Sequence, residues 1–244
     1  YLYHMIKNAH RSGYVSVIGN PNVGKSTLVN ALMGRDLSIT TAKAQTTRHR
    51  ILGFINGDDY QLILSDTPGI IKPAYEMQNS MMDFVKESLD DADVLIYMID
   101  VAERNIKDER LLEKIQKSKT PLLVLINKID TSTQEELEQA VQHWAMIFPD
   151  SSVIPISALK GFFIPDLLEI LISKIPESPP YFPKDQLSDK PERFFVNEAI
   201  RKNILENYDK EIPYAVEVVT EEFMEAEKII KIRSIILVER ETQK

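Results

Sequence analysis

The sequence predicts an α/β protein whose larger, first part is a mostly parallel sheet with helices on both faces. Short apolar runs typical of buried strands alternate with stretches of helical periodicity through the first two-thirds of the chain. This alternation favours βαβ units, because parallel neighbours need a crossover connection. A proline-rich segment then interrupts the pattern, and a shorter α+β stretch follows. We therefore expect two domains at residues 11–176 and 193–244, joined by a linker at residues 177–192.

Local signals support each element of the first domain. Residues 14–18 form a β-rich run, and residues 26–33 have a helical pattern that Gly34 stops. The pair Asn56-Gly57, between apolar runs at 51–55 and 60–65, favours a hairpin turn. Further strands are expected at 94–99, 122–126 and 153–156, and further helices near 76–90, 107–118, 134–147 and 163–175.

The second part begins after a segment that cannot be regular structure. Residues 176–183 hold four prolines, which exclude a central strand or a regular helix and predict a stiff linker. Amphipathic periodicity then predicts a helix at 194–207, and β-rich runs follow at 215–220 and 229–238. One helix and two strands make a thin core for an independent domain.

Composition and charge exclude several classes of protein. The chain has 244 residues, 43% of them hydrophobic and 27% charged, which is ordinary for a globular protein with a buried core. It has no cysteine, which excludes disulfides, thiolate metal sites and a cysteine nucleophile. The four histidines lack metal-ligand spacing. A net charge of −8 argues against nucleic-acid binding by this chain, because phosphate neutralisation needs clustered Lys and Arg.

The strongest chemical signal is the run Gly19-Asn20-Pro21-Asn22-Val23-Gly24-Lys25-Ser26, which fits the phosphate-loop pattern G-x-x-x-x-G-K-[ST]. Its glycines let backbone N–H groups curl around phosphate oxygens, and the helix that follows directs its positive end at the same anion. Lys25 would bridge β- and γ-phosphates, and Ser26 would ligate Mg²⁺. An ordinary strand–helix turn is the weaker alternative, because the motif follows a predicted strand and opens a predicted helix.

A second motif, Asp66-Thr67-Pro68-Gly69, follows the strand predicted at 60–65. An Asp at a strand end can hold Mg²⁺ through water, and the Gly69 N–H can reach a γ-phosphate. Alone, this tetrapeptide is a common turn. Downstream of the phosphate loop, it predicts a second metal element of the same site.

A third motif, Asn127-Lys128-Ile129-Asp130, follows the strand predicted at 122–126, where ligands of open α/β sheets bind. The Asp130 carboxylate can accept from both N1–H and N2–H₂ of guanine, a donor pair that adenine lacks. The aliphatic stem of Lys128 can lie against the base. The alternative for this run is a charged helix N-cap.

Two further segments indicate nucleotide or metal contacts only when they are read together with the three motifs above. Ser157-Ala158-Leu159-Lys160 would bring the Ala158 N–H to guanine O6. Gln45-Thr46-Thr47-Arg48 lies in a polar stretch, where a Thr can complete Mg²⁺ coordination while a γ-phosphate is present. Taken alone, the second segment is indistinguishable from a solvated loop.

These five elements, in this order, resemble the TRAFAC-class GTPases, and the match is closer to the Era-type ribosome-assembly GTPases. The runs that carry the resemblance are GNPNVGKSTLVNAL, KAQTTRHRILG, SDTPGI, LINKID and PISALKG. The run from SPPYFPKDQLSDKPERFF to VVTEEF, with IRSIILVERETQK beyond it, is similar to the Era linker and the opening of its KH domain. The similarity covers about residues 11–244. It implies a P-loop GTPase domain with a mostly parallel sheet, followed by an incomplete α+β KH-like domain of type II.

The resemblance also implies roles for single residues. It places Mg²⁺ among Ser26, Thr47 and Asp66, where Thr47 is preferred over Thr46 because it immediately precedes Arg48, as in related families. The catalytic candidates are Asn22, Lys25, Thr47 and Gly69. The residues implied to bind GTP or GDP are Gly19, Asn20, Pro21, Asn22, Val23, Gly24, Lys25, Ser26, Thr27, Asp66, Thr67, Pro68, Gly69, Ile70, Asn127, Lys128, Asp130, Ser157, Ala158 and Leu159.

Two positions bear on the rate of hydrolysis. Ile70 stands where Ras-like GTPases have a Gln that orients the attacking water, so we expect slow intrinsic hydrolysis. Asn22 matches an Asn that helps some related GTPases bind a potassium ion, which makes K⁺ a further candidate cofactor. Arg48 is the rival source of positive charge, and a solvated or RNA-facing role for it stays open.

The implied partners are the 3′ end of 16S rRNA and the 30S subunit, in small-subunit assembly by the full-length protein. A KH domain clamps nucleotides with a GXXG loop, but none of the eight glycines lies beyond Gly161. The chain stops at Lys244, where the family is expected to continue into that loop, so RNA binding by this chain is in doubt. A cytoplasmic monomer is expected, with peripheral association at the inner membrane face as a further hypothesis.

Several function classes remain open. One is an enzyme used as a switch, in which GTP hydrolysis times release from pre-ribosomal RNA. Another is a binding module whose nucleotide state gates partner contact, with turnover incidental. A GTPase of the tRNA-modification or tandem-GTPase type is weaker, because the KH-like tail argues against it. A metabolic kinase is disfavoured, because residues 127–130 would have no role there.

Overall fold

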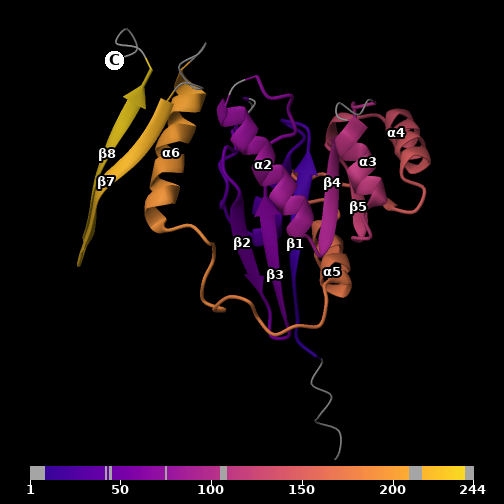
Figure 1. Ribbon diagram of the computed structural model, residues 1–244, viewed down its shortest axis with the longest axis horizontal. Helices are drawn as coiled ribbons and strands as arrows, with labels where there is room; N and C mark the ends of the chain where they lie inside the picture. The colour runs from indigo at the N-terminus through magenta and orange to yellow at the C-terminus, as the bar shows by residue number, and fades with distance from the viewer. Residues whose placement is uncertain are drawn as a thin grey trace, which may run out of the picture.

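A computed structural model describes residues 9–41, 43, 46–74, 76–104, 109–208 and 216–239 (Figure 1). Its six-stranded sheet has the strand order β2-β3-β1-β4-β5-β6, and β7 and β8 form a second, two-stranded sheet. All pairings in the larger sheet are parallel except that of β2 with β3, which confirms the predicted α/β fold. The strands of the larger sheet are β1 (Arg11–Gly19), β2 (Ile51–Asn56), β3 (Tyr60–Asp66), β4 (Val94–Asp100), β5 (Leu122–Asn127) and β6 (Ser152–Pro155).

Helices cover both faces of this sheet. On one face, α1 (Lys25–Met33) and α5 (Ile164–Lys174) pack on the inward-facing residues of the central strands. On the other face lie α2 (Glu76–Asp91), α3 (Glu109–Lys117) and α4 (Gln134–Ile147). Trp144 and Phe148 are buried in this second layer. The first two residues of the helix predicted at 107–118 lie outside the described residues.

The parallel strands deliver the three main motifs to one edge of the sheet. Gly19, Asp66 and Asn127 are the last residues of β1, β3 and β5. The register aligns their ends, since Val17 lies beside Asp66 and Asp100 of β4 lies beside Asn127. Ligand sites in open α/β sheets form at these carboxyl ends.

The proline-rich segment is not a free spacer. Residues 176–190, which we call the edge strap, pass below the sheet from α5 and run along β2 toward α6 (Figure 1). The Phe54 N–H donates to the Leu187 carbonyl at 3.0 Å, and the Leu52 N–H donates to Asp189 Oδ1 at 2.9 Å. The strap therefore satisfies exposed backbone groups of an edge strand, which sheets otherwise leave open to unwanted pairing.

A buried amide anchors the strap. Gln61 on β3 is fully buried, and its Oε1 accepts from the N–H groups of Tyr181 and Phe182 at 2.8 and 3.0 Å. Its Nε2 donates to the Phe182 carbonyl at 2.9 Å. The Phe182 ring stacks on Phe54 at a centroid distance of 4.2 Å. These contacts determine where the chain leaves the larger sheet.

The last described elements are α6 (Glu192–Asn207), β7 (Val216–Ala226) and β8 (Ile229–Val238). Their shared core is small, with Ile204, Val216 and Val218 buried. The β-rich run predicted to end at residue 220 continues to Ala226, because the acidic residues beyond it keep pairing with β8. Strand pairing needs backbone partners more than apolar side chains. No helix in the described ranges combines the length and apolar character needed to cross a membrane.

Candidate functional site

The loop between β1 and α1 has a backbone that only certain residues accept. Gly24 caps α1 with φ 102°, and Asn22 also has a positive φ, of 64°. A Cβ at Gly24 would lie 2.4 Å from the Nδ2 of Asn127, closer than real atoms approach. Glycine is therefore required at this position both for backbone conformation and for space.

Lys25 is buried inside this loop. Its Nζ donates to the carbonyls of Gly19 and Asn20 at 3.1 and 2.8 Å. Burial lowers the pKa of Lys25 to about 8, against the opposing effect of the Asp66 and Glu103 carboxylates. A desolvated ammonium held by the curl of the loop interacts strongly with an anion bound there.

Two hydroxyls meet at the start of α1. Ser26 Oγ lies 2.9 Å from Thr47 Oγ1, although the two residues come from different segments. Two oxygens at neighbouring corners of a Mg²⁺ octahedron, each about 2.1 Å from the ion, lie roughly 3 Å apart. This pair therefore fits one Mg²⁺, with Thr47 rather than Thr46 beside Ser26.

Asp66 lies behind these hydroxyls and is fully buried. Neither of its carboxylate oxygens has a partner in hydrogen-bond geometry among the described residues. Burial raises the pKa of Asp66, and the nearby hydroxyls of Ser38 and Ser26 oppose that shift. A buried carboxylate without a partner is costly, which suits a residue that faces a cation directly or through water.

The segment after Asp66 is pinned to the phosphate loop. Thr67 Oγ1 donates to the Val17 carbonyl at 2.7 Å, and the Ile70 N–H donates to the Gly19 carbonyl at 3.0 Å. A Cβ at Gly69 would lie 2.8 Å from Pro21, so a larger residue there would push the two loops apart. The Ile70 side chain is buried in the core cluster that includes Val85 of α2, and it does not line the cavity described below.

At the other end of the site, Asn127 joins two loops. Its buried side chain donates to the Val23 carbonyl at 2.8 Å and accepts from the Ala158 N–H at 2.9 Å. Asp130 is exposed, and its Oδ1 accepts from Ser157 Oγ at 2.5 Å. The carboxylate is therefore oriented by Ser157.

Some details at this end were not anticipated from the sequence. The Ala158 N–H, predicted to meet guanine O6, is donated to Asn127 in this structure. Leu159 is 74% exposed and borders no part of the cavity described next. Lys128 has a positive φ of 66° and its ammonium pairs with Asp100 at 2.7 Å.

A cavity of about 400 Å³ lies at the phosphate loop and is lined by residues from several segments of the site. Lys128 also lines this cavity, two residues before Asp130 in the chain. The cavity is lined by Pro21, Asn22, Gly24, Lys25, Ser26, Thr27, Ile39, Thr40, Thr41, Thr46, Thr47, Thr67, Gly69 and Lys128. Its size is in the range of sites for small molecules and cofactors.

Sequence reasoning missed part of this wall. Ile39, Thr40 and Thr41 line the cavity, but in the sequence they are an ordinary polar stretch after a helix. Glu103, which accepts from the Asn20 side chain, also gave no signal. Gln45 of the predicted threonine segment lies outside the described residues.

Comparison with known proteins places this geometry in a family. A family model described as "50S ribosome-binding GTPase" matches residues 14–128. The chain is 34% identical, with a TM-score of 0.89, to Era in complex with MgGDPNP and nucleotides 1506–1542 of 16S ribosomal RNA. That match covers 96% of this chain and 80% of the Era chain.

Two further structures mark how far the likeness extends. A tyrosine-to-alanine variant of Aquifex aeolicus Era, bound to GDP and AlF₄⁻, is 35% identical with a TM-score of 0.89 over 95% of this chain and 80% of its own. The elongation factor SelB of Methanococcus maripaludis, 19% identical with a TM-score of 0.54 over 86% of this chain and 41% of its own, shares the fold alone. From the phosphate loop to the β7–β8 sheet, the chain belongs to the Era-type GTPase family.

Proposed function

We propose that this chain binds GTP together with Mg²⁺ and hydrolyses GTP to GDP and phosphate. The observation that carries the proposal is the meeting of Lys25, Ser26, Thr47 and Gly69 on one cavity. The Era structures with MgGDPNP and with GDP and AlF₄⁻ support the same ligand chemistry. Asp130, oriented by Ser157, supports guanine as the base.

Each residue has a separable role in this proposal. Lys25 and the backbone N–H groups of the phosphate loop hold the β- and γ-phosphates. Ser26, Thr47 and Asp66 would hold Mg²⁺, which would offset negative charge on these phosphates. The Gly69 N–H, kept close to Pro21 by the lack of a side chain, can donate to the γ-phosphate. Together these groups position the γ-phosphate for in-line attack by water.

Intrinsic turnover is proposed to be slow. Ile70 follows the D-x-x-G glycine, and its buried side chain has no polar atom with which to orient water. The missing polar group must come from elsewhere in the site. Asn22 borders the cavity beside the phosphate loop and, by its match to related GTPases, supports K⁺ as that source of charge.

Phosphate release is therefore expected to be faster in K⁺ than in Na⁺ by roughly tenfold or more. One added positive charge beside the transition state lowers the barrier enough for a rate increase of that size. Single-turnover release at saturating Mg²⁺ and matched ionic strength measures this. Asn22→Gly is the informative variant, because glycine accepts the positive φ while the amide is removed. Its rate is expected to be the same in both salts. Equal rates for the unaltered chain in Na⁺ and K⁺ would contradict the potassium hypothesis.

We further propose that the full-length protein uses this cycle on the 3′ end of 16S rRNA during assembly of the 30S subunit. The Era complex with nucleotides 1506–1542 of 16S ribosomal RNA supports the RNA. In this chain α6, β7 and β8 are the KH-like elements of the proposal, and the sequence after Gly161 holds no glycine for a GXXG clamp. Cytoplasmic location, a monomeric state and peripheral membrane association rest on the family resemblance alone.

A binding module with incidental turnover is the second candidate, and the burial of Ile70 outside the cavity lining favours it. A fluorescent 3′-terminal 16S rRNA oligonucleotide, titrated with the full-length protein, separates RNA recognition from turnover. Tighter binding with a non-hydrolysable GTP analogue than with GDP is the expected result, because the analogue orders the threonine segment. Equal affinity with GDP, the analogue and no nucleotide would contradict a nucleotide switch. Normal assembly by a variant that binds GTP but cannot hydrolyse it would favour the binding module.

A further inference from the structure

The segment 46–48 is held from two sides. The Thr47 hydroxyl faces the nucleotide site, 2.9 Å from Ser26 Oγ. The residues on either side of Thr47 are hydrogen-bonded to α6 and β7. The Thr46 carbonyl accepts from Arg201 Nη2 of α6 at 2.5 Å, and Arg48 Nη1 donates to the Val216 carbonyl of β7 at 2.8 Å. One short stretch of backbone thus connects the candidate Mg²⁺ ligand to α6 and β7.

Arg201 is an unusual residue to find buried. Its side chain is 5% exposed and pairs with Glu198, one turn earlier, through Nε–Oε1 at 2.9 Å and Nη2–Oε2 at 2.6 Å. Burying an ion pair costs about as much desolvation free energy as the attraction between the two charges gives back. A contribution to the stability of α6 therefore does not explain why Arg201 is buried. The guanidinium instead directs a charge-assisted bond at the Thr46 carbonyl, and such bonds are strong and directional.

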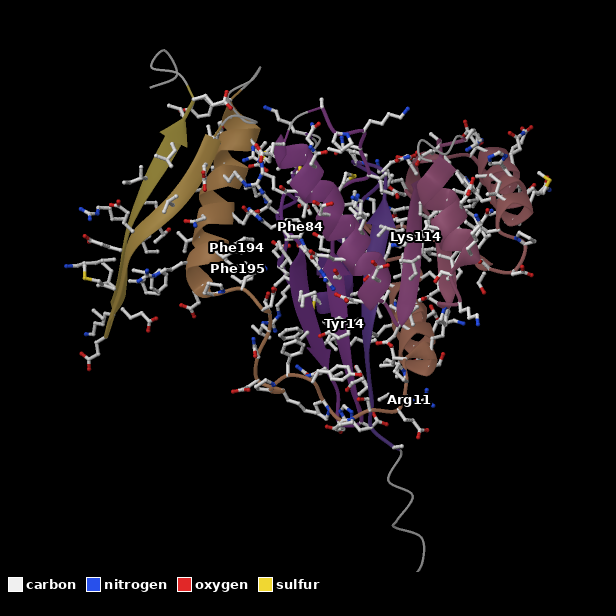
Figure 2. All side chains as sticks on the ribbon, in the orientation of Figure 1. Arg11, Tyr14, Phe84, Lys114, Phe194 and Phe195 are labelled. Carbon is white, nitrogen blue, oxygen red and sulfur yellow. The ribbon has the colours of Figure 1, made fainter. Side chains whose placement is uncertain are left out.

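Aromatic contacts hold α6 in place for this bond. The His49 ring lies between Phe84 of α2 and Phe194 of α6, at centroid distances of 6.3 and 5.9 Å. Figure 2 shows both phenylalanines where α2 and α6 face each other. Lys43 donates to the Tyr208 carbonyl just beyond the end of α6. The helix is therefore docked against described residues on both sides of Thr47.

We propose that Arg201 is a positioning residue for the triphosphate-bound state. By holding the Thr46 carbonyl, it sets the plane of the peptide that leads into Thr47 and keeps the Thr47 hydroxyl beside Ser26. This inference rests on the proposed function, since Thr47 matters only when a γ-phosphate and Mg²⁺ are present. GDP makes no use of Thr47, so Arg201 raises the preference for GTP over GDP rather than the affinity for both.

The test compares two affinities in the full-length protein at saturating Mg²⁺: that of a fluorescent GDP and that of a fluorescent non-hydrolysable GTP analogue. Arg201→Met removes the donor and is expected to weaken binding of the analogue about tenfold, the value of one charge-assisted hydrogen bond, with GDP affinity within twofold. Arg201→Lys restores one donor and is expected to recover part of the loss. Lys202→Met removes a charge from a half-buried neighbour on α6 and is expected to change neither affinity.

Two more variants keep the test decisive. Arg201→Met leaves Glu198 buried and unpaired, so the double variant Glu198→Met/Arg201→Met removes both charges and keeps the helix packed. It is expected to show the same selective loss. In a Thr47→Val background, Arg201→Met is expected to cost nothing further, because Arg201 acts through the Thr47 hydroxyl.

The failure of this inference is distinguishable from failure of the proposed function. Equal losses for GDP and the analogue in the double variant, or no loss for either, would overturn the role of Arg201. A further loss in the Thr47→Val background would overturn it as well. Absence of guanine-nucleotide binding by the unaltered protein would instead overturn the proposed function.

Discussion

Replacing Lys25 with alanine is expected to weaken binding of the GTP analogue by about 100-fold or more and to abolish measurable turnover. The ammonium is desolvated and held by two carbonyls of the phosphate loop, so its charge reaches the β- and γ-phosphates with little screening. GDP lacks the γ-phosphate, and its affinity is expected to fall less. Fluorescent-nucleotide titration and single-turnover phosphate release measure the two effects.

The matched control for this experiment is Lys86→Ala. Lys86 is an exposed lysine of α2 that pairs with Asp83 one turn earlier, so this variant removes the same charge without touching the site. Both variants are compared by thermal unfolding, because the alanine at position 25 frees two carbonyl groups in the loop. A correctly folded Lys25→Ala variant with unaltered affinity for the analogue would refute the phosphate-binding role.

Replacing Asp130 with asparagine is expected to lower GTP affinity by about 100-fold and to raise the affinity for XTP above that for GTP. The carboxylate accepts from N1–H and N2–H₂ of guanine, whereas the asparagine amide donates to the C2 carbonyl of xanthine. Ser157 can donate to the asparagine carbonyl as it does to the carboxylate, so the new side chain keeps its orientation. Competition of GTP and XTP for the bound fluorescent GDP measures the shift.

Asp150→Asn removes one carboxylate from an exposed position and serves as the control, with both affinities expected to stay unchanged. Base specificity is a difference between two affinities, so the ratio of GTP to XTP binding decides the outcome. An Asp130→Asn variant whose GTP affinity matches that of the unaltered chain would show that the base is recognised elsewhere.

Much of the fold was predictable because its signals are local. The strands of the larger sheet are apolar runs of the right length. Gly34 ends a helix, and the prolines near residue 180 end the regular structure of the first part of the chain. Both endings follow from local residue types, without any distant contact. The acidic end of β7 was not predicted, because its signal is not local. Its continuation to Ala226 depends on pairing with β8, and strand pairing is a property of two segments together.

The candidate site divides in the same way. The sequence by itself determined the chemistry, because the phosphate loop and the Asp66 and Asp130 motifs each place a required group a few residues from a strand end. Only the tertiary structure decided how these groups are held. The bridge made by Asn127, the inward turn of Ile70 and the bond from Arg201 to Thr46 join residues far apart along the chain. Contacts of this kind depend on how finished elements pack, and no local pattern of residues encodes them.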